Sequence, residues 1–284
     1  MKSYIGFTFA AMLAALPTTA LASKTCSVES VERINLDAAD IRTFKVSVGP
    51  DTVQLQGREQ DNGELRIRKC TSSDSRLEAL QASQLKRGDT LTLELDHGGK
   101  VNRHNSSLFG LLRSGNYGYF EISGTVPNHW ELDIAVGSGD ADISGVASVN
   151  IVIGSGDASI ENIAGEVAAT IGSGDLKVER AGTLSVGSIG SGDLEAENIS
   201  GAANIGSIGS GDAELESIDG DVTVGNIGSG TLDIKRVAGN VSVGTLGSGD
   251  IKASHIDGDF TLRSKGSGST NINNVNGAVR VPNR

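Results

Sequence analysis

Residues 209–227 read GSGDAELESIDGDVTVGNI, and residues 228–246 read GSGTLDIKRVAGNVSVGTL. Both stretches begin with Gly-Ser-Gly, carry two further glycines, one of them near the middle, and alternate aliphatic with polar residues. Gly-Ser-Gly occurs eight times in the chain, at intervals of 17, 18, 18 and then four times 19 residues. A fixed period of this length is typical of a solenoid, in which each copy forms one coil. The glycines of the predicted turns are Gly137, Gly139, Gly154, Gly156, Gly172, Gly174, Gly190, Gly192, Gly209, Gly211, Gly228, Gly230, Gly247, Gly249, Gly266 and Gly268.

The residues between the glycines alternate with a period of two. After one turn, Leu232 and Ile234 flank the polar Asp233, and after the next glycine Val241 and Val243 follow the same pattern. This period predicts short strands that point every second side chain into an aliphatic core. Successive coils would pair in parallel about 4.8 Å apart. Residues 131–284 are therefore predicted to form an all-β, single-stranded, right-handed parallel β-helix of about eight coils, because parallel crossovers are right-handed.

Residues 23–130 lack the repeat and are predicted to form a β-rich cap that ends the solenoid, since an uncovered edge would invite further pairing. Ser75 and Glu78 have the spacing of a capping box, which predicts one short helix through Leu77 and Leu80. Strands are predicted at residues 34–36, 44–48, 53–55, 65–67, 91–95 and 119–122.

The first 22 residues have the pattern of a secretory signal peptide. Lys2 precedes an apolar run over residues 4–16, and Ala20-Leu21-Ala22 matches the small-x-small cleavage pattern. The run is shorter than the roughly 20 residues that a membrane-spanning helix needs. We expect cleavage after Ala22 and export to the periplasm, the cell surface or the medium, with no transmembrane segment in the mature chain.

The two cysteines, Cys26 and Cys70, are predicted to form a disulfide, which an oxidising compartment permits. Closing a loop of roughly 45 residues would stabilise the fold by about 3–4 kcal/mol. Lipid attachment at Cys26 is the alternative, but the preceding residues 23–25, Ser-Lys-Thr, fit a lipoprotein signal badly.

The composition excludes some partners. The formal charge is -11, and it becomes about -12 when the signal peptide with Lys2 is removed, so nucleic acids and anionic membranes are repelled. Aromatic residues make up only 4% of the chain, which disfavours stacking on bases or sugars. A protein or glycan of the cell envelope remains as a partner, and nucleic acid does not.

One column of acidic residues follows the Gly-Ser-Gly turns. Calcium bridging between coils is one hypothesis, because carboxylate oxygens are calcium ligands. Turn chemistry is the other: the carboxylates would accept backbone N–H groups while glycines adopt positive φ. Thr231 and Ser269 favour the second, since a hydroxyl is a poor calcium ligand, and no cofactor is predicted. The candidate calcium column is Asp140, Asp157, Asp175, Asp193, Asp212 and Asp250.

The outward column beside it mixes signs, which predicts ladder ion pairs Lys177–Glu195 and Asp233–Lys252. We predict no catalytic site, because the carboxylates form no local cluster and the histidines show no metal-ligand spacing. The histidines are His97, His104, His129 and His255.

The segment 98–118 combines cations with apolar residues around Phe109. It is interpreted either as a contact loop or as a loop folded back on the cap.

The repeat resembles the DUF4097 family of bacterial envelope proteins, which are labelled putative adhesins. The resemblance rests on the Gly-Ser-Gly-Asp turns beginning at Gly137, the corner Ile218 to Val222, and the final run Gly277-Ala-Val-Arg-Val-Pro282. The early pair Cys26 and Cys70 also resembles the proteobacterial branch. The resemblance implies a β-helix of the cell envelope and supplies no functional residues to place on this chain.

Taken together, the sequence predicts an exported, non-enzymatic β-helix that acts as an adhesin-like binding or structural module. A carbohydrate-active β-helix enzyme and a calcium-stabilised surface protein are the alternatives.

Overall fold

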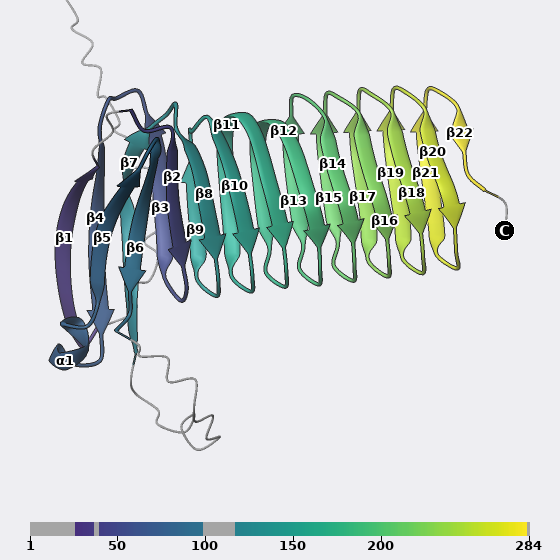
Figure 1. Ribbon diagram of the computed structural model, residues 1–284. Helices are drawn as coiled ribbons and strands as arrows, with labels where there is room; N and C mark the ends of the chain where they lie inside the picture. Colours follow the sequence, from purple (N-terminus) through teal and green to yellow (C-terminus); the bar gives the residue numbers. More distant parts are fainter. Residues whose placement is uncertain (1–25, 37–39, 99–116, 283–284) are drawn as a thin grey trace, which may run out of the picture.

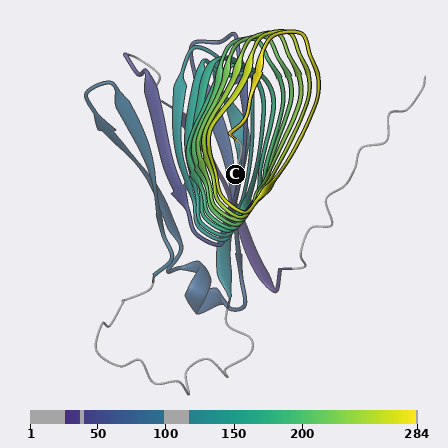
Figure 2. The same cartoon turned by 90° about the vertical axis from the view of Figure 1, so that its right-hand side faces the viewer.

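The computed structural model describes residues 26–36, 40–98 and 117–282. They form an all-β solenoid of about eight turns with one short helix near the N-terminus, as predicted (Figure 1). Seen along the rod, the coils lie over one another and enclose a narrow interior (Figure 2). The predicted signal peptide, residues 1–22, lies outside the described residues.

Each coil contributes one strand to each of two faces, and the strands of a face pair in parallel along the solenoid. Face 1 consists, from the N-terminal end, of β1 (Val28–Leu36), β4 (Gly63–Thr71), β7 (Gly118–Pro127), β3 (Thr52–Arg58), β9 (Asp140–Ser144), the first parts of β11 (Asp157–Ile171) and β12 (Leu176–Ile189), β13 (Leu194–Ile199), β15 (Ala213–Ile218), β17 (Thr231–Val237), β19 (Asp250–Ile256) and β21 (Ser269–Val275). Face 2 consists of β5 (Gln81–Arg87), β6 (Thr90–Asp96), β2 (Thr43–Val48), β8 (Glu131–Val136), β10 (Ser148–Ile153), the second parts of β11 and β12, β14 (Ala203–Ile208), β16 (Val222–Ile227), β18 (Val241–Leu246), β20 (Phe260–Lys265) and β22 (Val279–Arg280).

The stack of coils extends upstream of residue 131, where the repeat pattern begins. β2 pairs in parallel with β8, and β3 pairs in parallel with β9, so residues 43–58 form a coil of their own. Its turn is Gly49-Pro50-Asp51 in place of Gly-Ser-Gly. The sequence pattern does not reveal this coil, because the signature of a coil is its Gly-Ser-Gly turn and this turn lacks it. The strands of the coil show only the alternation of buried and exposed residues, which any half-buried strand shows.

The core is made of the inward side chains of both faces. Aliphatic residues and the ring of Phe260 fill the C-terminal coils, and the large rings of Phe44 and Trp130 stack at the N-terminal end, 6.1 Å apart. One residue in each coil, six places after the second glycine of the Gly-Ser-Gly turn, has a left-handed backbone that bends the strand and returns the next aliphatic residue to the core. These residues are Gly145, Asn162, Arg180, Asn198, Ser217, Arg236, His255 and Asn274, with φ between 53° and 71°.

The glycines of the Gly-Ser-Gly turns serve close packing of the coils. A Cβ atom built on the second glycine would lie 1.7–2.1 Å from a backbone carbonyl oxygen of the preceding coil, in every copy from Gly139 to Gly268. The prediction that these glycines adopt positive φ is wrong, because the described glycines with positive φ are Gly88, Gly98 and Gly145. The constraint is the spacing between coils, which leaves no room for a side chain.

The N-terminal end departs from the parallel pattern. β4 pairs antiparallel with β1 and β7, and β5 pairs antiparallel with β6, so both faces end in antiparallel strands. The helix α1 (Asp74–Leu77) begins after Ser73, and the predicted capping box at Ser75 is wrong. Gln81–Arg87 forms β5 because its backbone pairs with β6. No helix among the described residues is long and apolar enough to cross a membrane.

Gly211→Ala tests the packing of the coils. The new Cβ would lie 1.8 Å from the carbonyl oxygen of Gly192, so the two coils must separate. We expect the unfolding free energy to fall by about 3 kcal/mol or more, as for severe overpacking, measured by urea unfolding followed by circular dichroism. Gly187→Ala is the matched control, because its Cβ would meet only the exposed Thr170 side chain at 3.3 Å and a carbonyl at 3.8 Å. Equal losses for the two variants would contradict the packing account.

Candidate functional site

A shallow groove of about 950 Å³ runs along face 1 across successive coils. Its floor is formed by buried small and aliphatic residues such as Ala158, Leu176 and Leu194. The acidic column forms one wall, and the outward column of the strands forms the other. The carboxylates and amines of the walls are Asp140, Asp142, Asp157, Asp175, Asp193, Asp212, Asp233, Glu195, Glu214, Lys177 and Lys252.

The acidic column forms a hydrogen-bonded ladder along this groove. The backbone N–H of Asp175 donates to Asp157 Oδ1 at 3.0 Å, and the N–H of Asp193 donates to Asp175 Oδ1 at 2.9 Å. The same bond joins Asp212 to Asp193 at 2.9 Å and Thr231 to Asp212 at 2.7 Å. The carboxylates of Asp157, Asp175, Asp193 and Asp212 therefore accept the backbone N–H of the next coil, which offsets the repulsion between stacked charges.

These bonds join neighbouring coils and do not close the turn that carries the carboxylate. Where Thr231 interrupts the column, the N–H of Asp250 donates to the carbonyl oxygen of Gly230 at 3.1 Å, so the hydroxyl does not replace the carboxylate. The ladder resumes when the N–H of Ser269 donates to Asp250 Oδ1 at 3.2 Å. The prediction that these carboxylates accept N–H groups of their own turn is wrong, because they accept N–H groups of the next coil.

The groove is strongly acidic. Nine carboxylates and two ammonium groups line it. Lys177 pairs with Glu195 at 2.6 Å, as predicted, and this hydrogen bond raises the pKa of Lys177. Asp233 lies beside Lys252 in the register, but its carboxylate is 3.9 Å from Lys235 of its own strand.

Asp142 has a raised pKa. Partial loss of hydration in the groove is the main cause, and the negative charge of Glu161 adds to it. The groove thus holds more negative charge than its own side chains neutralise.

A second ladder lies at the opposite bend of the coil. The N–H of Asn240 donates to Asp221 Oδ1 at 2.7 Å, and the N–H of Asp259 donates to Asn240 Oδ1 at 2.9 Å. The bond to Arg280 lowers the pKa of Asp259, and the N–H of Ala278 lowers it further. This ladder is not among the features predicted from the sequence, although its signal is the repeated Gly-Asp or Gly-Asn pair at the second turn of each coil.

The described residues hold no group of three or more histidine, cysteine, aspartate or glutamate side chains that could bind a metal ion.

His97 contacts Asp51 at 2.8 Å, and Asp51 is fully buried and also accepts the N–H of Phe120 at 2.8 Å. Asp51 occupies the place of a turn glycine in the first coil, so this contact joins that coil to β7. His104 and most of the predicted contact loop 98–118 lie outside the described residues.

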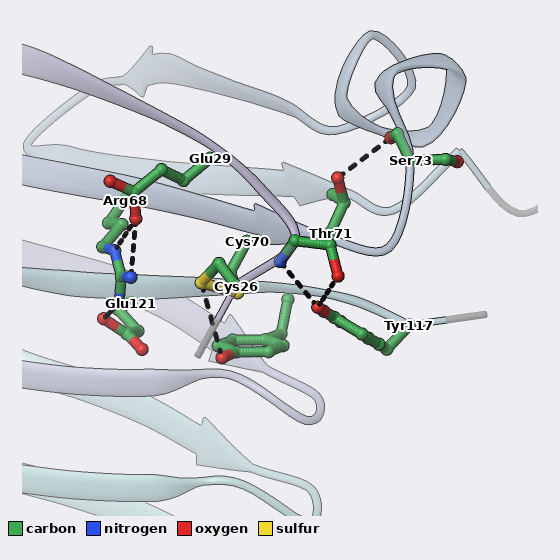
Figure 3. Close-up of a disulfide and its surroundings, with 10 residues drawn as sticks. Cys26, Glu29, Arg68, Cys70, Thr71, Ser73, Tyr117 and Glu121 are labelled. Atoms are coloured by element: carbon green, nitrogen blue, oxygen red, sulfur yellow. Dashed lines mark hydrogen bonds and ion pairs between the residues drawn. A yellow bond between two sulfur atoms is a disulfide. The ribbon is translucent and has the colours of Figure 1, made fainter. Parts of the chain in front are cut away.

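The disulfide between Cys26 and Cys70 links the chain before β1 to β4, with a Cα–Cα distance of 5.4 Å. Beside it, Arg68 pairs with Glu29 at 2.6 Å and with Glu121 at 2.8 Å, and so bridges β1, β4 and β7 (Figure 3). These two carboxylates raise the pKa of Arg68. The cluster holds the antiparallel strands together, and its Glu121 lies beside Thr52 at the N-terminal end of the groove.

Comparison with known proteins agrees with this architecture. Residues 166–283 match the model of the family Toastrack DUF4097. The resemblance to the DUF4097 family is confirmed for this part of the chain. None of the curated proteins matches the chain.

Two solved structures share the fold over most of their length. A putative lipid binding protein from Parabacteroides distasonis ATCC 8503 is 19% identical, with a TM-score of 0.54, and the match covers 85% of this chain and 96% of that one. A putative adhesin from Parabacteroides merdae ATCC 43184 is 16% identical, with a TM-score of 0.54, and the match covers 90% of this chain and 97% of that one. At these identities the likeness establishes the solenoid fold and transfers no binding residue.

Two variants of Asp193 test the ladder. Asp193→Ala removes the acceptor for the N–H of Asp212, and we expect a loss of about 1 kcal/mol in unfolding free energy. Asp193→Asn should remain as stable as the wild type, because an amide oxygen can accept the same bond, as Asn240 Oδ1 does from Asp259. Urea unfolding measures both variants, and equal losses would show that charge, and not the acceptor oxygen, is what the column requires.

Thermal unfolding in excess calcium and in chelator tests the calcium alternative. We expect no difference between the two conditions, because the coils are already joined by backbone donors to the carboxylates. A calcium site occupied at 100 times its Kd would add about 2.7 kcal/mol of stability. A clear upward shift of the melting temperature with calcium would assign the acidic column to metal binding.

Proposed function

We propose that the protein is exported and acts as a non-enzymatic, adhesin-like binding module of the bacterial cell envelope, with the acidic groove of face 1 as its binding surface. The single observation that carries this proposal is the continuity of the groove across the stacked coils. A groove built on paired strands is held in shape before a partner arrives, which reduces the entropy lost on binding.

Charge selects the class of partner. The nine carboxylates of the groove favour a protein that presents lysine or arginine side chains along an extended stretch. A neutral glycan is less well served, because the described residues that line the groove include no aromatic side chain for stacking on sugar rings. The names of the two similar structures, a putative adhesin and a putative lipid binding protein, support binding over catalysis.

Export is part of the same proposal. The signal-peptide pattern supports it, and so does the disulfide, which persists in oxidising compartments. Expression of residues 1–284 in a bacterial host, followed by cell fractionation and N-terminal sequencing, tests it. The expected result is a mature chain that begins at Ser23 in the periplasmic or extracellular fraction, and retention in the cytoplasm with an intact N-terminus would contradict it.

Retention of the mature chain on envelope fractions of the producing bacterium tests the groove. We expect Asp175→Asn, Asp193→Asn and Asp212→Asn, combined, to weaken retention roughly tenfold at low salt, since three exposed charge contacts of about 0.5 kcal/mol each sum to that factor. The asparagines preserve the acceptor oxygens of the ladder, so the fold should persist.

The matched control removes the same charge away from the groove, with Asp89→Asn, Asp219→Asn and Asp257→Asn combined. This variant should bind as the wild type does. Equal losses in both triple variants would mean that net charge, and not the groove, governs retention, and no loss in either would refute the groove as the binding surface.

A further inference from the structure

The two ends of the solenoid differ in how their outermost strands are protected. At the N-terminal end, β1 carries Glu29, Glu32 and Arg33, and β5 carries Lys86 and Arg87. Charged side chains on an edge strand oppose pairing with another chain, because the charge would lose its hydration there. The N-terminal edges of both faces are protected in this way.

The C-terminal edge of face 1 lacks this protection. β21 reads Ser-Thr-Asn-Ile-Asn-Asn-Val from Ser269 to Val275 and contains no charged residue. The preceding strands of face 1 each carry at least one charged side chain. These strands are β9, β11, β12, β13, β15, β17 and β19. β21 pairs with β19 on one side, and no strand among the described residues pairs with its other side.

The core is also incomplete at this end. Ile234 and Ile256 are fully buried in the preceding coils, whereas Ile272 and Val275, which continue these inward columns, are only partly buried. An uncharged strand with unpaired backbone groups and partly exposed aliphatic side chains is a template for one further strand.

The strand is complementary to itself. Asn274 has a left-handed backbone, so the straight part of β21 is 269–273, with Asn271 at its centre. An antiparallel pair about a two-fold axis at Asn271 would place Asn271 opposite its own copy and Thr270 opposite Ile272 of the partner. Inward residues then meet inward residues and outward residues meet outward residues, without any contact between like charges.

We propose that β21 is a homodimerisation edge, through which two copies of the chain join end to end in an antiparallel pair of β21 strands centred on Asn271. The proposal is independent of the acidic groove and of any envelope partner. Arg280 of β22 is bound to Asp259, and Lys265 occupies the place of Leu246 at the end of face 2, where its Nζ donates to Thr270 Oγ1 of β21 at 3.4 Å. The end of face 2 therefore carries charge, whereas β21 itself carries none, which favours face 1 for the contact. A contact of this size produces a weak dimer.

The experiment measures the mass of the mature chain by light scattering and sedimentation over a concentration series. The wild type is expected to shift from monomer to dimer as concentration rises. Asn271→Lys and Asn271→Glu should each weaken association at least about tenfold, because the two-fold axis places each new charge opposite itself. An equimolar mixture of the two variants should recover the dimer, because lysine then faces glutamate.

Both variants should fold, since the same outward column already holds Lys252 and Glu214 in other coils. Circular dichroism checks this, and Asn204→Lys, on face 2 of an internal coil, is a control that should dimerise as the wild type does. A wild type that stays monomeric at every concentration overturns the proposal. So does a dimer that persists in both single variants, or a mixture that fails to recover it.

Discussion

The close approach of neighbouring coils at the Gly-Ser-Gly turns is the constraint from which much of this structure follows. At Gly156 and Gly174 the position of a Cβ atom is occupied by a carbonyl oxygen of the coil before, 1.7 Å away. The turn can therefore contain only glycine at this place, and each coil is aligned on the previous one by its own backbone. Stacked in this way, equivalent residues of successive coils become neighbours, so every position of the repeat becomes a column along the rod.

The columns explain how a chain with this much negative charge tolerates its own stacking. The carboxylate directly after the turn accepts the backbone N–H of the equivalent residue in the next coil. The same side chains that repel one another along the column therefore also join the coils. The outward column beside it includes lysines, and the pair Lys177–Glu195 neutralises part of the charge. The remainder is concentrated in the groove of face 1, where it is available to a partner.

The N-terminal end differs from the rest of the rod, because the first coil has no preceding coil to pair with. Asp51 stands at the turn position that glycine occupies elsewhere, and its buried carboxylate accepts the N–H of Phe120 and contacts His97. Antiparallel strands then complete both faces, held by the Cys26–Cys70 disulfide and by Arg68. No comparable cover follows β21 among the described residues, which gives the rod two unlike ends.

The sequence by itself determined the solenoid, its period and the inward columns, because these features are repeated and every copy shows the same alternation of buried and exposed residues. It determined the cysteine pair because the chain has only two cysteines. It did not determine the first coil at residues 43–58, the strand β5 or the purpose of the turn glycines. Those depend on which backbone lies alongside: Gln81–Arg87 extends because β6 pairs with it, and Gly139 is glycine because Asp51 O lies 1.7 Å from its missing Cβ. The groove, likewise, exists only when residues 17 to 19 positions apart are stacked, and so only the tertiary structure could place its carboxylates side by side.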